Sequence, residues 1–226
     1  MTTKQIPLPL GEAPAQRFET FFGGPNAESM SAARGFADGV LNARSLVVHG
    51  PPGCGKSHIV NAVAHTLSAR GLKVHAIDLV QDFDESYTLP DDADAIIADG
   101  AHASLPPPVE GALFNWYNAH ALNDGKVIVA LRPPLAGSEI RDDLRTRLAA
   151  GLVVRLSALD DTELKLALAH HARARGLELN DGVLQYLVTR LTRDMGTLTA
   201  LLEGLDTLSL AEKRAISIPL LRTLIS

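Results

Sequence analysis

The stretch that decides the fold is GPPGCGKS, residues 50–57. It has the form G-x-x-x-x-G-K-[ST], it follows the apolar run SLVVH (45–49), and a helical pattern continues over 56–70. A strand, a glycine-rich loop and a helix in this order form a P-loop, whose backbone N–H groups surround phosphate at a helix N-terminus. The alternative is a glycine-rich turn that binds nothing, and the complete motif in this context disfavours it.

Each part of the loop has an expected chemical role. Gly53 and Gly55 let the backbone turn so that its N–H groups point inward. Lys56 is expected to reach the outer phosphates, and the Ser57 hydroxyl to ligate Mg²⁺. Cys54 is interpreted as a small filler, with a redox switch as the alternative. The residues of the loop and its helix that are expected to bind nucleotide are Gly50, Pro51, Gly53, Cys54, Gly55, Lys56, Ser57 and His58.

Outward from the loop, short apolar runs alternate with helical stretches as far as residue 156. Strands that alternate with helices indicate a parallel sheet covered on both faces, which makes the fold class α/β. The five expected strands are 45–49, 73–79, 95–99, 126–131 and 151–156.

After residue 156 only helical patterns follow. Asp160 and Glu163 have the spacing of a capping box at the start of the first helix, and Gly176 is expected to end it. The expected helices are 160–176, 180–192, 195–213 and 218–225.

These patterns predict three parts: a flexible N-terminal arm (1–16), an α/β base domain (17–157) and a small all-helical domain (158–226). Near the start of the base domain, Asn26 is the expected N-cap of a helix over 26–41.

Composition excludes several classes of protein. The chain of 226 residues is 46% hydrophobic and carries a net charge of −5, which argues against a broad nucleic-acid-binding surface. One cysteine excludes an internal disulfide and fits a reducing cytosol. The start MTTKQIPLPL lacks the apolar core of a secretory signal, and no apolar run is long enough to span a membrane. We therefore expect a cytoplasmic protein without a membrane partner.

A P-loop domain followed by a helical domain resembles the AAA+ ATPases. In that resemblance DAIIADG (94–100) is the Walker B strand, and Asp99 lies beside the Mg²⁺ ion. Gly100 stands where an acidic residue activates water, and Leu131 stands where a polar sensor contacts the γ-phosphate. Glycine and leucine can neither accept a proton nor orient water. Phosphate and metal binding are therefore expected to remain, and hydrolysis to be lost.

Three stretches make the resemblance more specific: LRPPL (131–135), RTRLAAGLVVRL (145–156) and HARARGLELNDGVLQYLVTRLTRDMGTL (171–198). They are similar to the DnaA-related AAA+ family, and most of all to its short Hda branch, the regulatory inactivators of DnaA. The resemblance covers almost the whole chain and implies a helical lid after the sheet domain. DnaA's further helix-turn-helix domain is not expected, so neither is sequence-specific DNA binding.

The same resemblance assigns roles to several arginines. Arg147 matches the arginine finger, which stabilises charge on a nucleotide held by a neighbouring subunit. The alternative is a surface arginine before a strand, and only the resemblance distinguishes Arg147 from Arg141 and Arg145. Gly196 occupies the position of the sensor-2 arginine, with Arg193 one helical turn away. This loss favours ADP over ATP as the resident nucleotide.

The N-terminal stretch QIPLPL (5–10) matches a motif of Hda-like proteins, Q-L-x-L-P-L, that docks on the sliding clamp of the replicative polymerase. A proline-stiffened peptide loses little entropy on docking. The alternative is a tail that contains prolines by chance. The expected clamp-binding residues are Gln5, Ile6, Leu8, Pro9 and Leu10.

The resemblance therefore implies an ADP- and Mg²⁺-binding regulator that stimulates hydrolysis of DnaA-bound ATP and is not itself an autonomous enzyme. Alternatives are an autonomous ATPase, such as a helicase loader of the DnaC type, and a small-molecule P-loop kinase. The sequence leaves homo-oligomer formation open.

Overall fold

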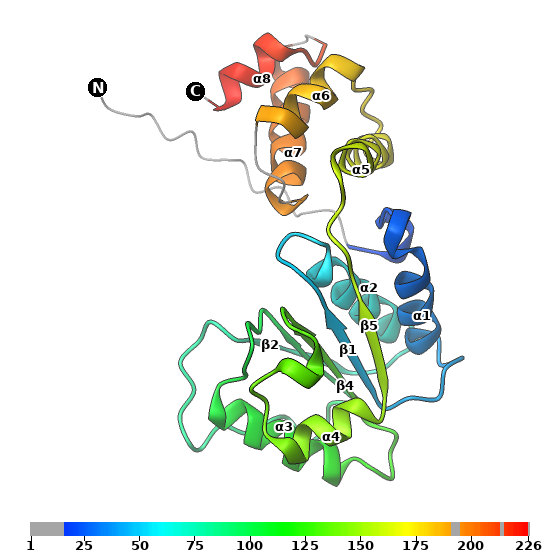
Figure 1. Cartoon of the computed structure of the whole chain (residues 1–226), viewed down its shortest axis with the longest axis vertical. Coiled ribbons are helices and arrows are strands. Elements are labelled where there is room, and N and C mark those ends of the chain that lie inside the picture. The colour runs from blue at the N-terminus through cyan, green and yellow to red at the C-terminus, as the bar shows by residue number, and fades with distance from the viewer. Residues whose placement is uncertain (1–15, 191–194, 213–214, 226) are drawn as a thin grey trace. The chain divides into compact units, whose positions relative to one another are not determined.

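The computed structural model describes residues 16–190, 195–212 and 215–225. The described residues belong to two compact units, one of Gln16–Ala158 and one that includes Leu159–Ser226 (Figure 1).

The first unit is built on a parallel sheet of five strands in the order β2-β3-β4-β1-β5. This confirms the expected fold class, and each strand lies within two residues of its predicted range. The strands are β1 (Ser45–His49), β2 (Val74–Asp78), β3 (Ala95–Asp99), β4 (Lys126–Leu131) and β5 (Leu152–Arg155).

Two pairs of helices cover the two faces of the sheet (Figure 1). The pair α1 (Ala27–Ala37) and α2 (Lys56–Ala69) shares one core cluster with side chains from alternate strand positions, Leu46 and Val48 among them. The pair α3 (Pro107–Ala119) and α4 (Asp142–Ala149) shares the other cluster, which takes the remaining strand positions. Apolar side chains on both faces explain why the strands are continuous apolar runs.

Asn26 is the N-cap residue of α1, as predicted, but its side chain forms no capping bond to that helix. Its Nδ2 donates to the carbonyl of Ser157 at 3.0 Å, and its Oδ1 accepts from the Ser157 N–H at 2.7 Å. Asn26 therefore joins the start of α1 to the segment after β5, a partner 131 residues away that local spacing cannot reveal.

The second unit consists of helices α5 (Asp161–Ala174), α6 (Asp181–Arg190), α7 (Met195–Glu212) and α8 (Ile218–Ile225) around a leucine-rich core. The predicted capping box is confirmed, because Asp160 accepts from the Glu163 N–H and Glu163 accepts from the Asp160 N–H, both at 2.8 Å. Gly176, at φ +74°, follows α5 as expected. Among the described helices, none combines the length and apolar character that crossing a bilayer requires.

Candidate nucleotide site and arginine finger

The P-loop leaves β1 at the edge of the sheet where all the parallel strands have their carboxyl ends, the edge at which such folds bind ligands. The strand order β3-β4-β1 brings the ends of three strands together there. Asp99 ends β3, Leu131 ends β4 and His49 ends β1. The fold therefore gathers the predicted loop, the predicted metal ligand and the altered sensor position at one edge.

The loop backbone depends on its glycines. Gly53 has φ +74° and Gly55 has φ +95°, values that residues with a side chain rarely adopt. Gly55 is the N-cap of α2, and a Cβ added there would lie 2.8 Å from Cε2 of Phe21. The turn into α2 therefore needs glycine both for its backbone conformation and for the close approach of an aromatic ring.

Lys56 and Ser57 begin α2. The Lys56 ammonium donates to the carbonyls of Gly50 and Pro51, each at 2.8 Å, so this charge lies within the loop that it is predicted to serve. The exposed Ser57 hydroxyl and the half-buried Asp99 carboxylate are hard oxygen donors of the kind that Mg²⁺ prefers. The donor set fits the predicted cofactor.

Cys54 is buried, and burial raises the pKa of its thiol although the neighbouring Lys56 opposes the shift. A cysteine with a raised pKa is mostly protonated at neutral pH and is a poor nucleophile. This supports the interpretation of Cys54 as a filler of the loop.

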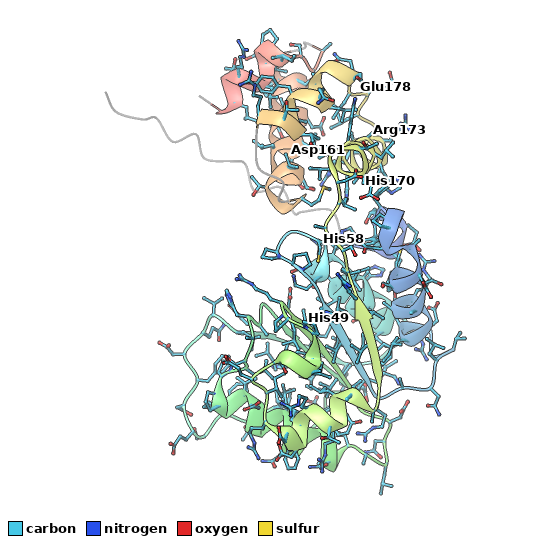
Figure 2. The ribbon with its side chains drawn as sticks, in the orientation of Figure 1. His49, His58, Asp161, His170, Arg173 and Glu178 are labelled. Carbon is cyan, nitrogen blue, oxygen red and sulfur yellow. The ribbon has the colours of Figure 1, made fainter. Side chains whose placement is uncertain are left out.

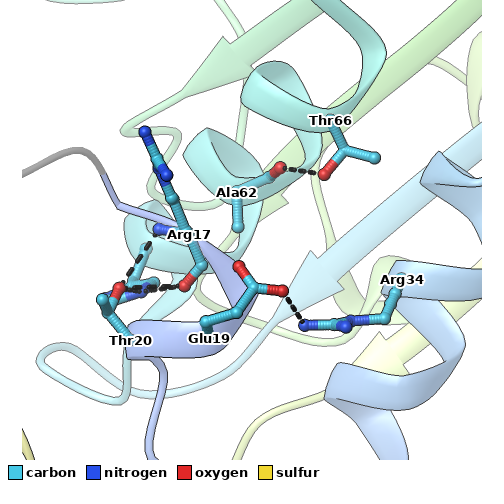
Figure 3. Close-up of polar contacts among 7 residues, drawn as sticks. Arg17, Glu19, Thr20, Arg34, Ala62 and Thr66 are labelled. Carbon is cyan, nitrogen blue, oxygen red and sulfur yellow. Dashed lines mark hydrogen bonds and ion pairs between the residues drawn. The ribbon is translucent and has the colours of Figure 1, made fainter. Parts of the chain in front are cut away.

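His58 fastens the segment 16–22 to the first turn of α2. Its Nε2 lies 2.9 Å from the carbonyl of Arg17 and 3.2 Å from Oγ1 of Thr20. Its ring meets Phe21 edge-on, with 5.3 Å between centroids. Figure 2 labels His58, and Figure 3 shows the Arg17–Thr20 turn that it contacts.

The same segment is tied to both helices of this face. Glu19 forms an ion pair with Arg34 of α1 at 2.6 Å (Figure 3), and Gln16 accepts from Nδ2 of Asn61 of α2 at 2.8 Å. The segment that follows the N-terminal arm is thus fixed beside the P-loop.

The positions that would support hydrolysis lack the necessary groups. Gly100 has φ +89° and open space where a Cβ would stand, and its N–H donates to Oδ1 of Asp99 at 2.7 Å. Leu131 is fully buried. Neither position offers a base or an oriented polar group to a water molecule.

His49, which the sequence analysis missed, is the last residue before the loop, and it is labelled in Figure 2. Its exposed fraction is 9%. Burial, and secondarily the charge of Arg155, hold its pKa below the usual value, so the ring is neutral at neutral pH. No local pattern marks this residue, because the histidine simply ends an apolar strand.

Arg147 lies near the other end of the strands, where the parallel strands have their amino ends. Ser45 begins β1, and its hydroxyl donates to the carbonyls of Arg147 at 3.4 Å and Leu148 at 3.1 Å. The P-loop follows the other end of the same strand, roughly 13 Å away at about 3.3 Å per residue. Arg147 is therefore placed away from the loop of its own chain.

The contacts of Arg147 hold its guanidinium against α3. Its Nε donates to Oδ1 of Asn118 at 2.8 Å, and its Nη1 donates to the carbonyl of Asp143 at 2.9 Å. Its Cζ lies 4.4 Å from the centroid of the Phe114 ring, within cation–π range. The Nη2 group makes no hydrogen bond to any described residue.

Ion pairing distinguishes the three arginines near this site, which the residues alone did not. Arg141 pairs with Asp143 at 2.6 Å, and Arg145 pairs with Asp142 at 2.5 Å. Arg147 forms no ion pair with a carboxylate in the part of the chain that the structure describes.

The remaining predicted positions contribute no described side chain to this site. The clamp-binding residues of the arm, 5–10, and Arg193 lie outside the described residues. Gly196 lies in the first turn of α7, so its position offers no side chain to a nucleotide.

Comparison with protein families gives two matches. Residues 152–225 match the family described as Hda, lid domain. Residues 46–106 match the ATPase family associated with various cellular activities (AAA).

Several solved structures share the fold. Domain III of the Thermotoga maritima replication initiation protein DnaA is 20% identical with a TM-score of 0.73, over 93% of this chain and 95% of that one. AMPPCP-bound DnaA from Aquifex aeolicus is 18% identical with a TM-score of 0.65, over 88% and 70%. The Thermotoga maritima RuvB Holliday junction branch migration motor is 15% identical with a TM-score of 0.61, over 92% and 72%. A P-loop sheet domain that matches the AAA family, followed by an Hda-type lid, makes this chain an Hda-related AAA+ protein, and its fold is that of DnaA domain III.

Proposed function

We propose that this protein is an ADP-binding regulator of replication initiation. It docks on the DNA polymerase sliding clamp through its N-terminal arm, and its Arg147 stimulates hydrolysis of the ATP bound to DnaA. The outcome is DnaA in its ADP form, which prevents a second initiation. The cytoplasm is the proposed place of action.

The nucleotide is proposed to bind at the P-loop. Lys56 and the loop N–H groups would hold its phosphates, and Ser57 and Asp99 would hold the Mg²⁺ ion, which neutralises phosphate charge when bound. The left-handed glycines 53 and 55 support this, because they give the loop the backbone of an anion cradle. Gly100 and the buried Leu131 leave no base for cleavage, which favours a resident diphosphate over an autonomous ATPase or helicase loader.

The observation that carries the proposal is the state of Arg147. Its guanidinium has no carboxylate partner among the described residues, while Arg141 and Arg145 are each neutralised by an aspartate. It also lies at the edge of the sheet away from its own P-loop, so any nucleotide that it serves belongs to another molecule. An arginine finger acting in trans needs both properties, an uncompensated charge and a position from which a neighbour can be reached.

Docking on the clamp is proposed from the sequence of the arm. The described chain begins at Gln16, which is fastened to α2. Residues 5–10 precede this anchor by only a few positions, so a clamp bound to the arm would lie near the base domain.

The test of the finger uses ATP-bound DnaA, clamp loaded on DNA, and this protein with its nucleotide. Arg147→Ala is expected to lower the stimulated hydrolysis rate by about 10³-fold or more. Arg145→Ala is the matched control, because it removes an arginine two residues away that is already paired with Asp142. If both variants stimulate hydrolysis as well as the parent, the finger assignment is wrong.

The test of the arm measures binding to the clamp alone. Replacing Leu8 and Leu10 with alanine should abolish clamp binding and leave the affinity for ADP unchanged. A double variant that still binds the clamp like the parent would contradict the docking motif.

A further inference from the structure

Arg132 follows β4 at the centre of the candidate nucleotide edge. The Gly50 N–H of the P-loop donates to the carbonyl of Leu131 at 3.2 Å. The Arg132 N–H donates to the carbonyl of His102, in the segment after Asp99, at 3.0 Å. The backbone of Arg132 is therefore fixed between the P-loop on one side and the continuation of β3 on the other.

Arg132 is the first residue after β4, and the chain bends at Arg132 and Pro133. The bend leaves the backbone of Arg132 beside the P-loop, at the carboxyl ends of the strands, and the residue is exposed.

Asp99, the last residue of β3, lies on the α2 side of the sheet by strand alternation, because Ile97 packs in the cluster with α1 and α2 and Ala98 packs in the other cluster. Asp99 and Arg132 lie at the ends of the neighbouring strands β3 and β4, and adjacent strands are about 4.8 Å apart. Both residues are therefore close to a ligand held by the loop.

The Arg132 guanidinium forms no hydrogen bond, ion pair or aromatic contact with any residue that the structure describes, and the residue is exposed. Two other arginines of this unit do have such partners: Arg44 lies over the Tyr117 ring at 4.1 Å, and Arg70 donates to the carbonyl of Ala37. An uncompensated guanidinium beside an anion-binding loop matches the geometry and charge of a phosphate group.

We propose that Arg132 is a phosphate-binding residue of this chain's own nucleotide site. The inference rests on the nucleotide binding of the proposed function and adds a ligand contact to it. Arg132 supplies a cation at the edge where Leu131 cannot contact phosphate. A guanidinium stays protonated and cannot act as a base towards water, so Arg132 strengthens binding without restoring hydrolysis.

The experiment is a titration of the full chain with ADP and Mg²⁺. Arg132→Ala is expected to raise the dissociation constant about tenfold, since a charge-assisted contact is lost at a solvent-accessible site. The dissociation constant of Arg132→Lys should fall between those of the parent and the alanine variant, because lysine keeps the positive charge but cannot form two parallel hydrogen bonds to a phosphate. Arg141→Ala, which removes the arginine just before α4 that already pairs with Asp143, should leave the dissociation constant unchanged. An Arg132→Ala variant that binds ADP within about twofold of the parent overturns the inference.

Lys56→Ala separates this inference from the proposed function. If the parent binds no ADP, the proposed nucleotide site itself fails. If the parent binds ADP, Lys56→Ala does not, and Arg132→Ala binds like the parent, only the role of Arg132 fails. Thermal unfolding without nucleotide should be the same for the parent and Arg132→Ala, because the exposed side chain forms no hydrogen bond, ion pair or aromatic contact with a described residue.

Discussion

The guanidinium of Arg147 lies over the ring of Phe114, with 4.4 Å between Cζ and the ring centroid. Asn118, one turn further along α3, accepts from the Arg147 Nε at 2.8 Å. The two contacts restrict a long side chain that would otherwise lose up to about 2 kcal/mol of rotamer freedom each time it enters a neighbouring site. They also leave Nη2 available, which is the end of the side chain that a phosphate would meet.

We predict that Asn118→Ala lowers the maximal stimulation of DnaA-bound ATP hydrolysis about tenfold, because Arg147 loses the bond that fixes its Nε. Asn115→Ala is the matched control: Asn115 is exposed on the same helix and forms no bond to Arg147. Single-turnover hydrolysis at saturating protein measures the effect. Equal rates for the two variants would contradict a role for Asn118 in holding the finger.

The strands could be predicted from the sequence because each is a continuous apolar run between turn signals. Helix α4 could not, since its eight residues, DDLRTRLA, are half charged and bury only Leu144 and Leu148. Arg141 and Arg145 form ion pairs with nearby aspartates, and charged residues of this kind give no apolar period to recognise.

The candidate site was predictable only in part, because some of its features depend on contacts between residues far apart in the sequence. The P-loop is a local motif, so its residues could be named from spacing alone. The distinction of Arg147 from its neighbours depends on carboxylates that only the folded α4 places, and the buried state of His49 depends on strands far away in the chain. Local spacing cannot supply such non-local information.

Gly55 and Gly71 form a matched pair of glycines. Both have positive φ, but an added Cβ at Gly55 meets Phe21 at 2.8 Å, while at Gly71 it meets nothing within 4 Å. Gly71→Ala should lower the free energy of unfolding by about 1–2 kcal/mol through backbone strain alone. Gly55→Ala should lower it by about 1–3 kcal/mol more, because the ring must move as well.

Urea unfolding of the two glycine variants measures the difference. Gly55→Ala should also weaken ADP binding, and Gly71→Ala should not, because only Gly55 belongs to the loop. If Gly55→Ala and Gly71→Ala had the same free energy of unfolding, the Phe21 ring could move away from the added Cβ without lowering stability.

Asn26 offers a test of the link between α1 and the segment after β5. Asn26→Ala removes both hydrogen bonds to the Ser157 backbone in a site where Asn26 is only 2% exposed. The expected loss is about 2–4 kcal/mol in the free energy of unfolding, because two backbone groups lose their partners. Ser29→Ala is the control; its hydroxyl donates to the Arg155 carbonyl at 2.6 Å in an exposed position, and its loss should cost about 1 kcal/mol or less. Similar losses for both variants, measured by urea unfolding, would contradict the special role of Asn26.

His49 makes the stability of the sheet unit depend on pH in a defined window. Its pKa in the folded chain is lowered from the usual 6.5, mainly by burial. The unfolded chain therefore binds a proton more readily than the folded chain, so this contribution is complete above about pH 6.5 and is lost as the pH falls through the folded-state pKa. The slope from this one group cannot exceed about 1.4 kcal/mol per pH unit.

The measurement compares the free energy of unfolding of the parent and His49→Gln at about pH 7.5 and about pH 5.5. The parent should lose more stability between the two values, because glutamine has no proton to gain. Glu19 and Asp143 have pKa values lowered by neighbouring groups, so both stay ionised in this window and add no slope. The remaining histidines are common to both proteins and cancel in the difference. An equal loss in the two proteins would mean that His49 accepts its proton without disturbing the strand end, and that the ring is not held neutral beneath the P-loop.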